Sequence, residues 1–203
     1  MSVNREIFRA SKAQIWEQLA RELDGKIVQG YYWEGDKVVV RHRKWVVTLD
    51  TFAITVRKVR TLYTRLRAPY ENTDGFRFKV YRKNPLSDIG KLLGMQDVLI
   101  ADAAFDEEFI VKSNEEAKVG ILLSNAHIRQ LIFAQPEILL QVKDDEGWFG
   151  SDFPKGVDEL YFEAPGVLMN LEHLESLFTL FAEVLDRLCE MGAAYEREPG
   201  VSL

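Results

Sequence analysis

Apolar residues recur along this chain with two different periods, and each period predicts a different kind of element. Behind Ser11, which begins a capping-box pattern, apolar positions follow helical spacing as far as Gly25, so we expect a helix over about residues 11–24. From residue 26 to residue 83 apolar and polar positions alternate instead, and short turn sequences separate the runs. This second pattern predicts an antiparallel meander of about five strands.

The second half of the chain mixes the two periods. Pro85 suits the first position of a helix over residues 84–94, and Ser113 and Asn125 are positioned to cap two further helices. We expect these two helices to end near residues 123 and 134. Short apolar runs predict strands over residues 98–100, 109–111, 138–142 and 160–164, and a polar loop with glycines over residues 144–156.

The strongest helical signal lies near the end of the chain. Asn170 can cap a long helix and Gly192 can end it, and an apolar stripe runs between them. The stripe consists of Leu171, Leu174, Leu177, Phe178, Phe181, Leu185 and Leu188. Four of these residues are expected in the hydrophobic core: Leu177, Phe178, Phe181 and Leu185.

Together these elements predict an α+β fold. We expect a curled antiparallel sheet of about seven to nine strands, with an N-terminal helix, middle helices and a long C-terminal helix. A helix-grip arrangement and a pleckstrin-like roll both fit this order of elements. Residues 1–203 are expected to form one domain, or two packed subdomains over residues 1–83 and 84–195, with a frayed tail over residues 196–203.

Three segments between residues 97 and 187 add a resemblance to this expectation. They are FDEEFIVKSN at residues 105–114 before a capped helix, EILLQV at residues 137–142, and DELYFEA at residues 158–164 before the closing helix. In this stretch the chain resembles an uncharacterised bacterial protein family, a domain of unknown function. The family has no assigned activity, so the resemblance implies a fold and carries over no catalytic residues.

The composition favours a soluble, cytoplasmic protein. An apolar fraction of 47% suits a packed core, and no apolar run approaches the length of a membrane span. The chain starts without the apolar region of a secretory signal, and its one cysteine, Cys189, cannot form an internal disulfide.

Charge is distributed unevenly along the chain. The sequence has 26 Lys and Arg against 32 Asp and Glu, which gives a formal net charge of −6. Residues 37–83 alone contain thirteen basic and three acidic side chains, which leaves a charge of −16 on the rest. A local excess of positive charge attracts anionic groups, so this segment is the feature that points to a partner.

Alternation along two of the expected strands places the basic residues of this segment on one face. Tyr63, Arg65 and Arg67 share a face of one strand, and Arg77, Lys79 and Tyr81 share a face of the next. If the two strands pair as a hairpin, these six residues form one solvent-facing surface. Such a surface suits an acidic protein surface, a phosphorylated ligand or a lipid headgroup. An ordinary solvated outer face of a sheet gives the same pattern.

No catalytic signature occurs in the sequence. His42, His127 and His173 are far apart and have no metal-ligand spacing, and Cys189 lies on the apolar stripe of the closing helix. The acidic clusters lack the spacing of a calcium loop. Trp148, Phe149 and Phe153 lie in the polar loop, where they suit either an interface or a cover over the core. We therefore expect no metal, no cofactor and no catalytic residues.

Three functional hypotheses remain. The leading one is a non-enzymatic binding protein whose basic face contacts an anionic partner. The second is a carrier of an apolar small molecule, held in a cavity between the sheet and the closing helix. The third is an enzyme whose site is assembled from scattered carboxylates and arginines. Pairing between the basic and acidic regions of different copies would also make the protein a homo-oligomer.

Overall fold

The computed structural model describes residues 2–30, 35–83, 95–144, 153–201 and 203, with side chains from residue 11 onward. Ten strands in the described residues form one antiparallel sheet, and five helices accompany them. The strands are β1 (Lys26–Val28), β2 (Lys37–His42), β3 (Trp45–Val56), β4 (Val59–Asn72), β5 (Phe78–Arg82), β6 (Gln96–Val98), β7 (Phe109–Ser113), β8 (Leu139–Lys143), β9 (Val157–Pro165) and β10 (Ala194–Tyr195). The helices are α1 (Ser2–Glu22), α2 (Ala103–Glu108), α3 (Glu116–Leu123), α4 (Ala126–Phe133) and α5 (Leu171–Glu190).

The predicted α+β class and the antiparallel sheet are confirmed. The sheet is open and has the order β1-β2-β3-β4-β9-β8-β5-β7-β6, while β10 pairs with the end of β4. It has one strand more than the upper limit expected from the sequence. Five strands do form between residues 26 and 83, but the expected pairing of the last two is wrong, because β5 pairs with β7 and β8 and not with β4.

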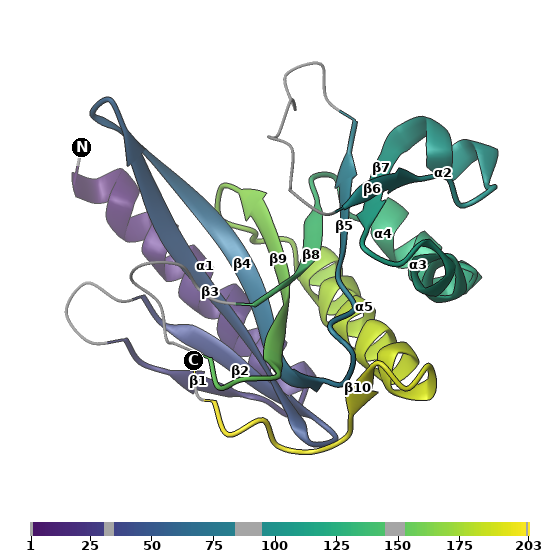
Figure 1. The fold of residues 1–203 in the computed structure, drawn as a ribbon. Coiled ribbons are helices and arrows are strands. Elements are labelled where there is room, and N and C mark those ends of the chain that lie inside the picture. Colours follow the sequence, from purple (N-terminus) through teal and green to yellow (C-terminus); the bar gives the residue numbers. More distant parts are fainter. Residues whose placement is uncertain (1, 31–34, 84–94, 145–152, 202) are drawn as a thin grey trace.

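Two long helices run side by side along one face of the sheet (Figure 1). α5 contributes the largest share of buried side chains, and the predicted core residues Leu177, Phe178, Phe181 and Leu185 are all 5% exposed or less. Trp16 and Leu19 of α1 are buried in the same cluster. The apolar stripe of the closing helix is therefore confirmed as core.

Helix ends follow local capping chemistry in most places. The side chains of Asn170 and Asn125 accept hydrogen bonds from backbone N–H groups of α5 and α4, as their positions in the sequence predict. α1 begins at Ser2, well before the capping pattern at Ser11, so that predicted start is wrong. The sequence analysis missed the short helix α2, and the helix predicted over residues 84–94 lies outside the described residues.

The two faces of the sheet differ in character because side chains alternate along each strand. On β4, Leu66, Ala68 and Tyr70 are fully buried on the face that the long helices cover. Arg65 and Arg67 alternate with them and point to the opposite face. We call this opposite face the polar face, and it carries Asp50, Arg65, Arg67, Lys79, Lys143, Glu159, Tyr161 and Glu163.

Candidate functional site

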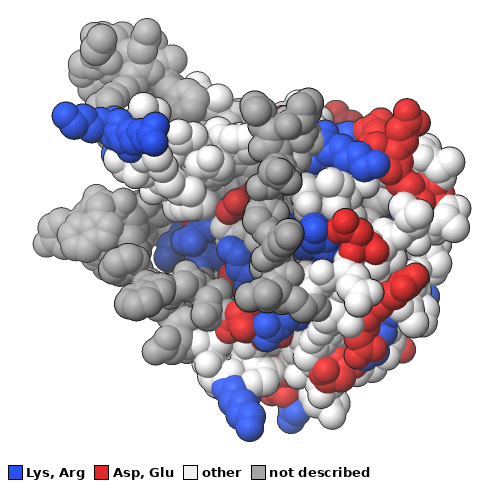
Figure 2. All heavy atoms as spheres, turned by 45° about the horizontal axis from the view of Figure 1, so that its top comes forward, with Lys and Arg blue, Asp and Glu red and all other residues white. Residues whose placement is uncertain are grey.

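Strand register brings the residues of the polar face into rows that cross the sheet. Arg67 on β4 lies opposite Thr48 on β3 and opposite Tyr161 on β9. The same row continues through Gln141 on β8 to Lys79 on β5. Residues that are far apart in the sequence therefore meet on one surface. Figure 2 shows basic and acidic atoms lying next to one another over the middle of the molecule.

Asp50 is the centre of a buried ion cluster. Its carboxylate accepts hydrogen bonds from Arg65 Nε at 2.6 Å and from Arg67 Nη2 at 2.7 Å, and it is only 3% exposed. Burial acts to lower the pKa of Arg65, but the hydrogen bond and the charge of Asp50 outweigh it and raise that pKa. For Arg67 burial is the stronger effect, and its pKa is lowered. Both guanidinium groups are thus held in place by one carboxylate.

Glu159 lies fully buried on the same face. It is 0% exposed, and neither of its carboxylate oxygens has a hydrogen-bond partner in the part of the chain that the structure describes. Burial raises the pKa of Glu159 to about 7, against the opposing charges of Arg67 and Lys143. Near neutral pH this carboxyl group therefore exists in both the protonated and the ionised form.

Two lysines on the polar face have no carboxylate close enough for an ion pair among the described residues. Lys143 Nζ lies 3.2 Å from the centre of the Tyr161 ring, and Lys79 Nζ lies 5.5 Å from that of Tyr81. Burial lowers the pKa of both lysines, although the charge of Glu163 acts in the other direction. The rings offset only part of the lost hydration, and within the described ranges neither ammonium group has a carboxylate as a close counter-charge.

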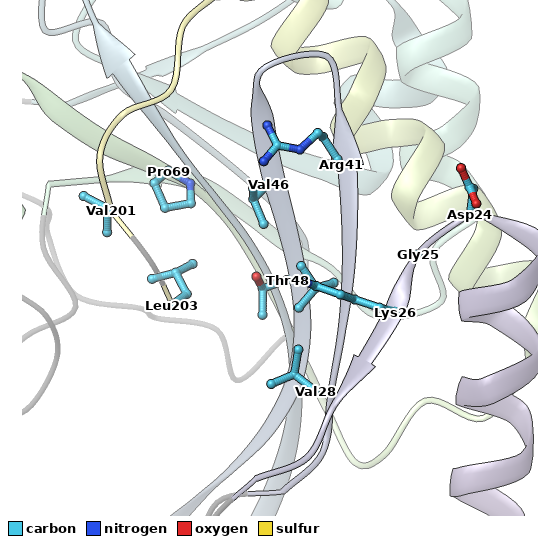
Figure 3. Close-up of a pocket in the computed structure, with 11 residues that line it drawn as sticks. Asp24, Gly25, Lys26, Val28, Arg41, Val46, Thr48, Pro69, Val201 and Leu203 are labelled. Carbon is cyan, nitrogen blue, oxygen red and sulfur yellow. The ribbon is translucent and has the colours of Figure 1, made fainter.

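A groove of about 400 Å³ adjoins this charged cluster (Figure 3). Its apolar lining consists of Val28, Val39, Val46, Pro69, Val201 and Leu203. In the close-up, Val201 and Leu203 of the C-terminal tail face Val46 and Thr48 of β3 across the groove. The tail is tied to the rest of the molecule, since Glu198 pairs with Arg41 at 2.8 Å.

Strand pairing places the groove next to the charged cluster on the same face of the sheet. Thr48 lines the groove and lies directly opposite Arg67, and Pro69 lines it and lies directly opposite Glu159. Neighbouring strands are about 4.8 Å apart, so the apolar lining begins one strand away from the buried charges. The apolar groove and the charged side chains thus lie on neighbouring strands of one face.

The predicted basic face is only partly as expected. Tyr63, Arg65, Arg67, Lys79 and Tyr81 do point to the same side of the sheet, but β9 and β8 lie between the strands that carry them. Arg67 and Lys79 are 2% and 5% exposed, so the expectation that they face solvent is wrong. Tyr63 stacks on Phe52 with a centroid distance of 5.5 Å.

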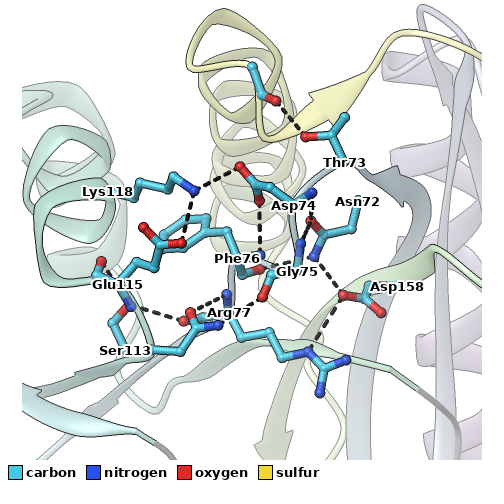
Figure 4. A network of polar contacts seen from close by, with 12 residues as sticks. Asn72, Thr73, Asp74, Gly75, Phe76, Arg77, Ser113, Glu115, Lys118 and Asp158 are labelled. Atoms are coloured by element: carbon cyan, nitrogen blue, oxygen red, sulfur yellow. Dashed lines mark hydrogen bonds and ion pairs between the residues drawn. The ribbon is translucent and has the colours of Figure 1, made fainter.

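Arg77 belongs to a different group of contacts (Figure 4). Its guanidinium pairs with Asp144 at 2.9 Å and approaches Asp158 to 3.6 Å. Asn72 Nδ2 also donates to Asp158 at 2.6 Å, and Lys118 pairs with Asp74 in the same turn. These contacts fix the connection between β4 and β5, and acidic residues already neutralise Arg77 there.

Sequence reasoning missed the acidic members of the site. Asp50, Glu163 and Lys143 were not singled out. Glu159 was considered only as part of an acidic cluster expected in a solvated turn, and that expectation is wrong because it is buried in β9. The signal was available on β9, where Glu159 and Glu163 alternate with the buried Leu160 and Phe162. Two carboxylates on one face of a strand whose other face is buried indicate partner charges on the neighbouring strands.

The histidines and the cysteine lie outside this site. His42 Nε2 is 2.9 Å from Asp186, His127 Nδ1 is 3.5 Å from Glu183, and Cys189 packs against the core. The described residues contain no group of three or more side chains placed to hold a metal ion. Within the same residues, every helix is too short or too polar to span a membrane.

Comparisons with known proteins return little. No family model matches the chain, which agrees with its resemblance to an uncharacterised family, and no curated protein matches it. One solved structure that aligns with it is the mycobacterial trehalose monomycolate transport factor A, TtfA. The two chains share 10% identity at a TM-score of 0.49, over 87% of this chain and 94% of that one.

Proposed function

We propose that this protein binds a small amphipathic molecule on its polar face, with the anionic group near Lys143 and Arg65 and the apolar part in the adjoining groove. One observation carries the proposal. A lysine without an ion-pair partner among the described residues, Lys143, lies two strands from Pro69, which lines a groove with largely apolar walls. The proposed role is binding of an anionic group, as in the leading hypothesis from the sequence. The ligand is a small molecule with an apolar part, as in the second hypothesis.

The charge balance of the cluster favours an anion. Its basic members are Arg65, Arg67, Lys79 and Lys143, and its acidic members are Asp50, Glu159 and Glu163. Among the described residues, Lys79 and Lys143 form no ion pair with a carboxylate, so each offers a positive charge to a ligand anion. Because burial makes an uncompensated charge unfavourable, a ligand anion would stabilise the cluster.

Access and size favour a small ligand. The Arg65 side chain is 24% exposed, and Lys143 is half-buried, so both can be reached while Arg67 and Glu159 cannot. A volume of about 400 Å³ lies within the usual range for small-molecule sites. Pro69 and Lys143 flank Glu159 in one row of the sheet, so two strand spacings, or about 10 Å, separate the groove wall from the lysine. Decanoate, an extended alkyl carboxylate, has a length of this order.

Core packing between the sheet and the closing helix favours a ligand site on the polar face. The carrier hypothesis from the sequence instead expects a cavity between the sheet and that helix. Leu66, Phe162 and Phe181 are each 0% exposed there, and they pack against one another as core. The groove on the polar face is instead bordered by strands and by the C-terminal tail.

Calorimetric titration with three probes tests the proposal: decanoate, its neutral analogue 1-decanol, and acetate. We expect saturable binding of decanoate and much weaker binding of the other two probes. 1-Decanol lacks the anionic group, and acetate lacks the alkyl chain. Lys143→Gln should weaken decanoate binding by about tenfold or more, as expected for loss of a charged hydrogen bond. Arg21→Gln, an exposed change on α1, serves as the control.

Two results would overturn the proposal. If decanoate binds the Lys143→Gln variant as tightly as it binds the unaltered protein, Lys143 is not part of an anion site. Equal affinity for 1-decanol and decanoate would show that the charged cluster takes no part in recognition.

A further inference from the structure

The hairpin between β3 and β4 extends well beyond the rest of the sheet (Figure 1). The pairing of β9 with β4 ends at Tyr63, and that of β2 with β3 ends at Leu49. Residues 54–62, which we call the hairpin arm, pair with each other, and every one of them is exposed. An isolated two-stranded ribbon is only marginally stable in water. The exposed apolar side chains of the hairpin arm do not pack in the core, so a contribution to folding does not explain them.

The hairpin arm is amphipathic. Val56 and Val59 lie directly opposite each other at its end and are 61% and 66% exposed, and Ile54 on the same face is 42% exposed. The turn consists of Arg57 and Lys58, and Arg60 follows on the other face. Residues 51–70 contain no acidic side chain. None of the three basic side chains forms an ion pair with a described residue.

The backbone of the turn adds a second, independent observation. Arg57 and Lys58 have φ angles of 46° and 70°, in the left-handed region that favours glycine and asparagine. A two-residue hairpin loop of this kind prefers Asn-Gly. This chain instead has two cationic side chains at strained positions. Strain of this kind is common where side chains have a role beyond folding.

We propose that the hairpin arm docks on the surface of an anionic lipid bilayer. Val56, Val59 and Ile54 enter the boundary between headgroups and acyl chains, and Arg57, Lys58 and Arg60 contact lipid phosphates. From Ala53 to Arg57 the strand rises about 13 Å, which exceeds the ~5–10 Å depth reached by interfacial apolar faces. Aliphatic tips surrounded by cations match this boundary, whereas single-stranded nucleic acid requires aromatic stacking surfaces.

Vesicle flotation with the full chain tests this docking. Vesicles of phosphatidylcholine alone are compared with vesicles that contain about a quarter phosphatidylglycerol, at low and high salt. We expect binding to the anionic vesicles only, with a strong decrease as salt rises from about 0.1 M to 0.5 M, because salt screens the attraction.

Two double variants separate the charges from the apolar tip. Arg57→Asn with Lys58→Gly should reduce vesicle affinity by about 20-fold or more, at roughly fivefold per basic residue. The same variant should unfold at the same or a higher temperature, since Asn-Gly relieves the turn. Val56→Ser with Val59→Ser keeps all charges and should still weaken binding about tenfold. Arg21→Gln with Lys155→Gln, which also removes two exposed basic residues, should bind as the unaltered protein does.

The proposal is overturned if the unaltered protein fails to float with anionic vesicles. It is equally overturned if the charge-matched control loses as much binding as the turn variant. Salt-sensitive binding to single-stranded nucleic acid that survives Val56→Ser with Val59→Ser, together with no vesicle binding, would assign the hairpin arm to nucleic acid instead.

Discussion

Glu159 is a carboxyl group whose protonation the fold controls. Burial raises its pKa from 4.5 to about 7, so the folded protein binds this proton more tightly than the unfolded chain does. The resulting contribution to stability is fully present below the unfolded pKa. It is lost as the pH rises through about 7, when a buried negative charge forms without a hydrogen-bond partner among the described residues.

Glu159→Gln should therefore change how stability depends on pH. Between about pH 5 and pH 8 the ionisation of Glu159 is expected to remove on the order of 3 kcal/mol from the unfolding free energy. The glutamine variant should lose less over this interval than the unaltered protein, as measured by urea unfolding at both values. Glu137→Gln changes an exposed carboxyl group and is the matched control. Equal pH dependence of all three proteins would contradict the assigned pKa.

At the scale of elements, α5 and β9 show which patterns can be predicted. The apolar stripe of α5 and its cap at Asn170 depend on residues within one or two helical turns, and both were predicted. The alternation of β4 also gave the correct face for Arg65 and Arg67. The partner of β4 was not predictable in this way, because Tyr63 pairs with Pro165 and no local rule selects a strand that distant.

Phe181→Ala tests the packing of α5 against the sheet. Phe181 is 0% exposed, so the change should lower the unfolding free energy by about 3–5 kcal/mol through lost burial and a residual cavity. Thr179→Ala alters an exposed position of the same helix and should change stability by less than about 0.5 kcal/mol. Denaturant unfolding of both variants measures the difference. A loss below about 1 kcal/mol for Phe181→Ala would mean that this side chain is not a core residue.

At the scale of the whole molecule, the charge asymmetry of the sequence has a structural explanation. The basic segment over residues 37–83 provides Arg65, Arg67 and Lys79 to the polar face, and the acidic part of the chain provides Glu159 and Glu163 on β9. Composition predicted a local positive excess but not its partial neutralisation, which depends on the order of strands. Of the described basic side chains on the polar face, Lys143 and Lys79 form no ion pair, and Lys143 comes from outside the basic segment.

The two proposals concern different parts of the molecule. The ligand site rests on the middle of β4, β8 and β9, and membrane docking rests on residues 54–62 at the far end of β3 and β4. Each set of variants leaves the other region unaltered. The vesicle and calorimetric experiments can therefore fail separately.

A crystal structure of the protein with decanoate is the most direct test of the account. We predict the carboxylate within hydrogen-bond distance of Lys143 Nζ or the Arg65 guanidinium, with the alkyl chain directed toward Val46 and Pro69 in the groove. Decanoate bound between the sheet and α5, or with its carboxylate away from both basic side chains, would contradict the proposed function.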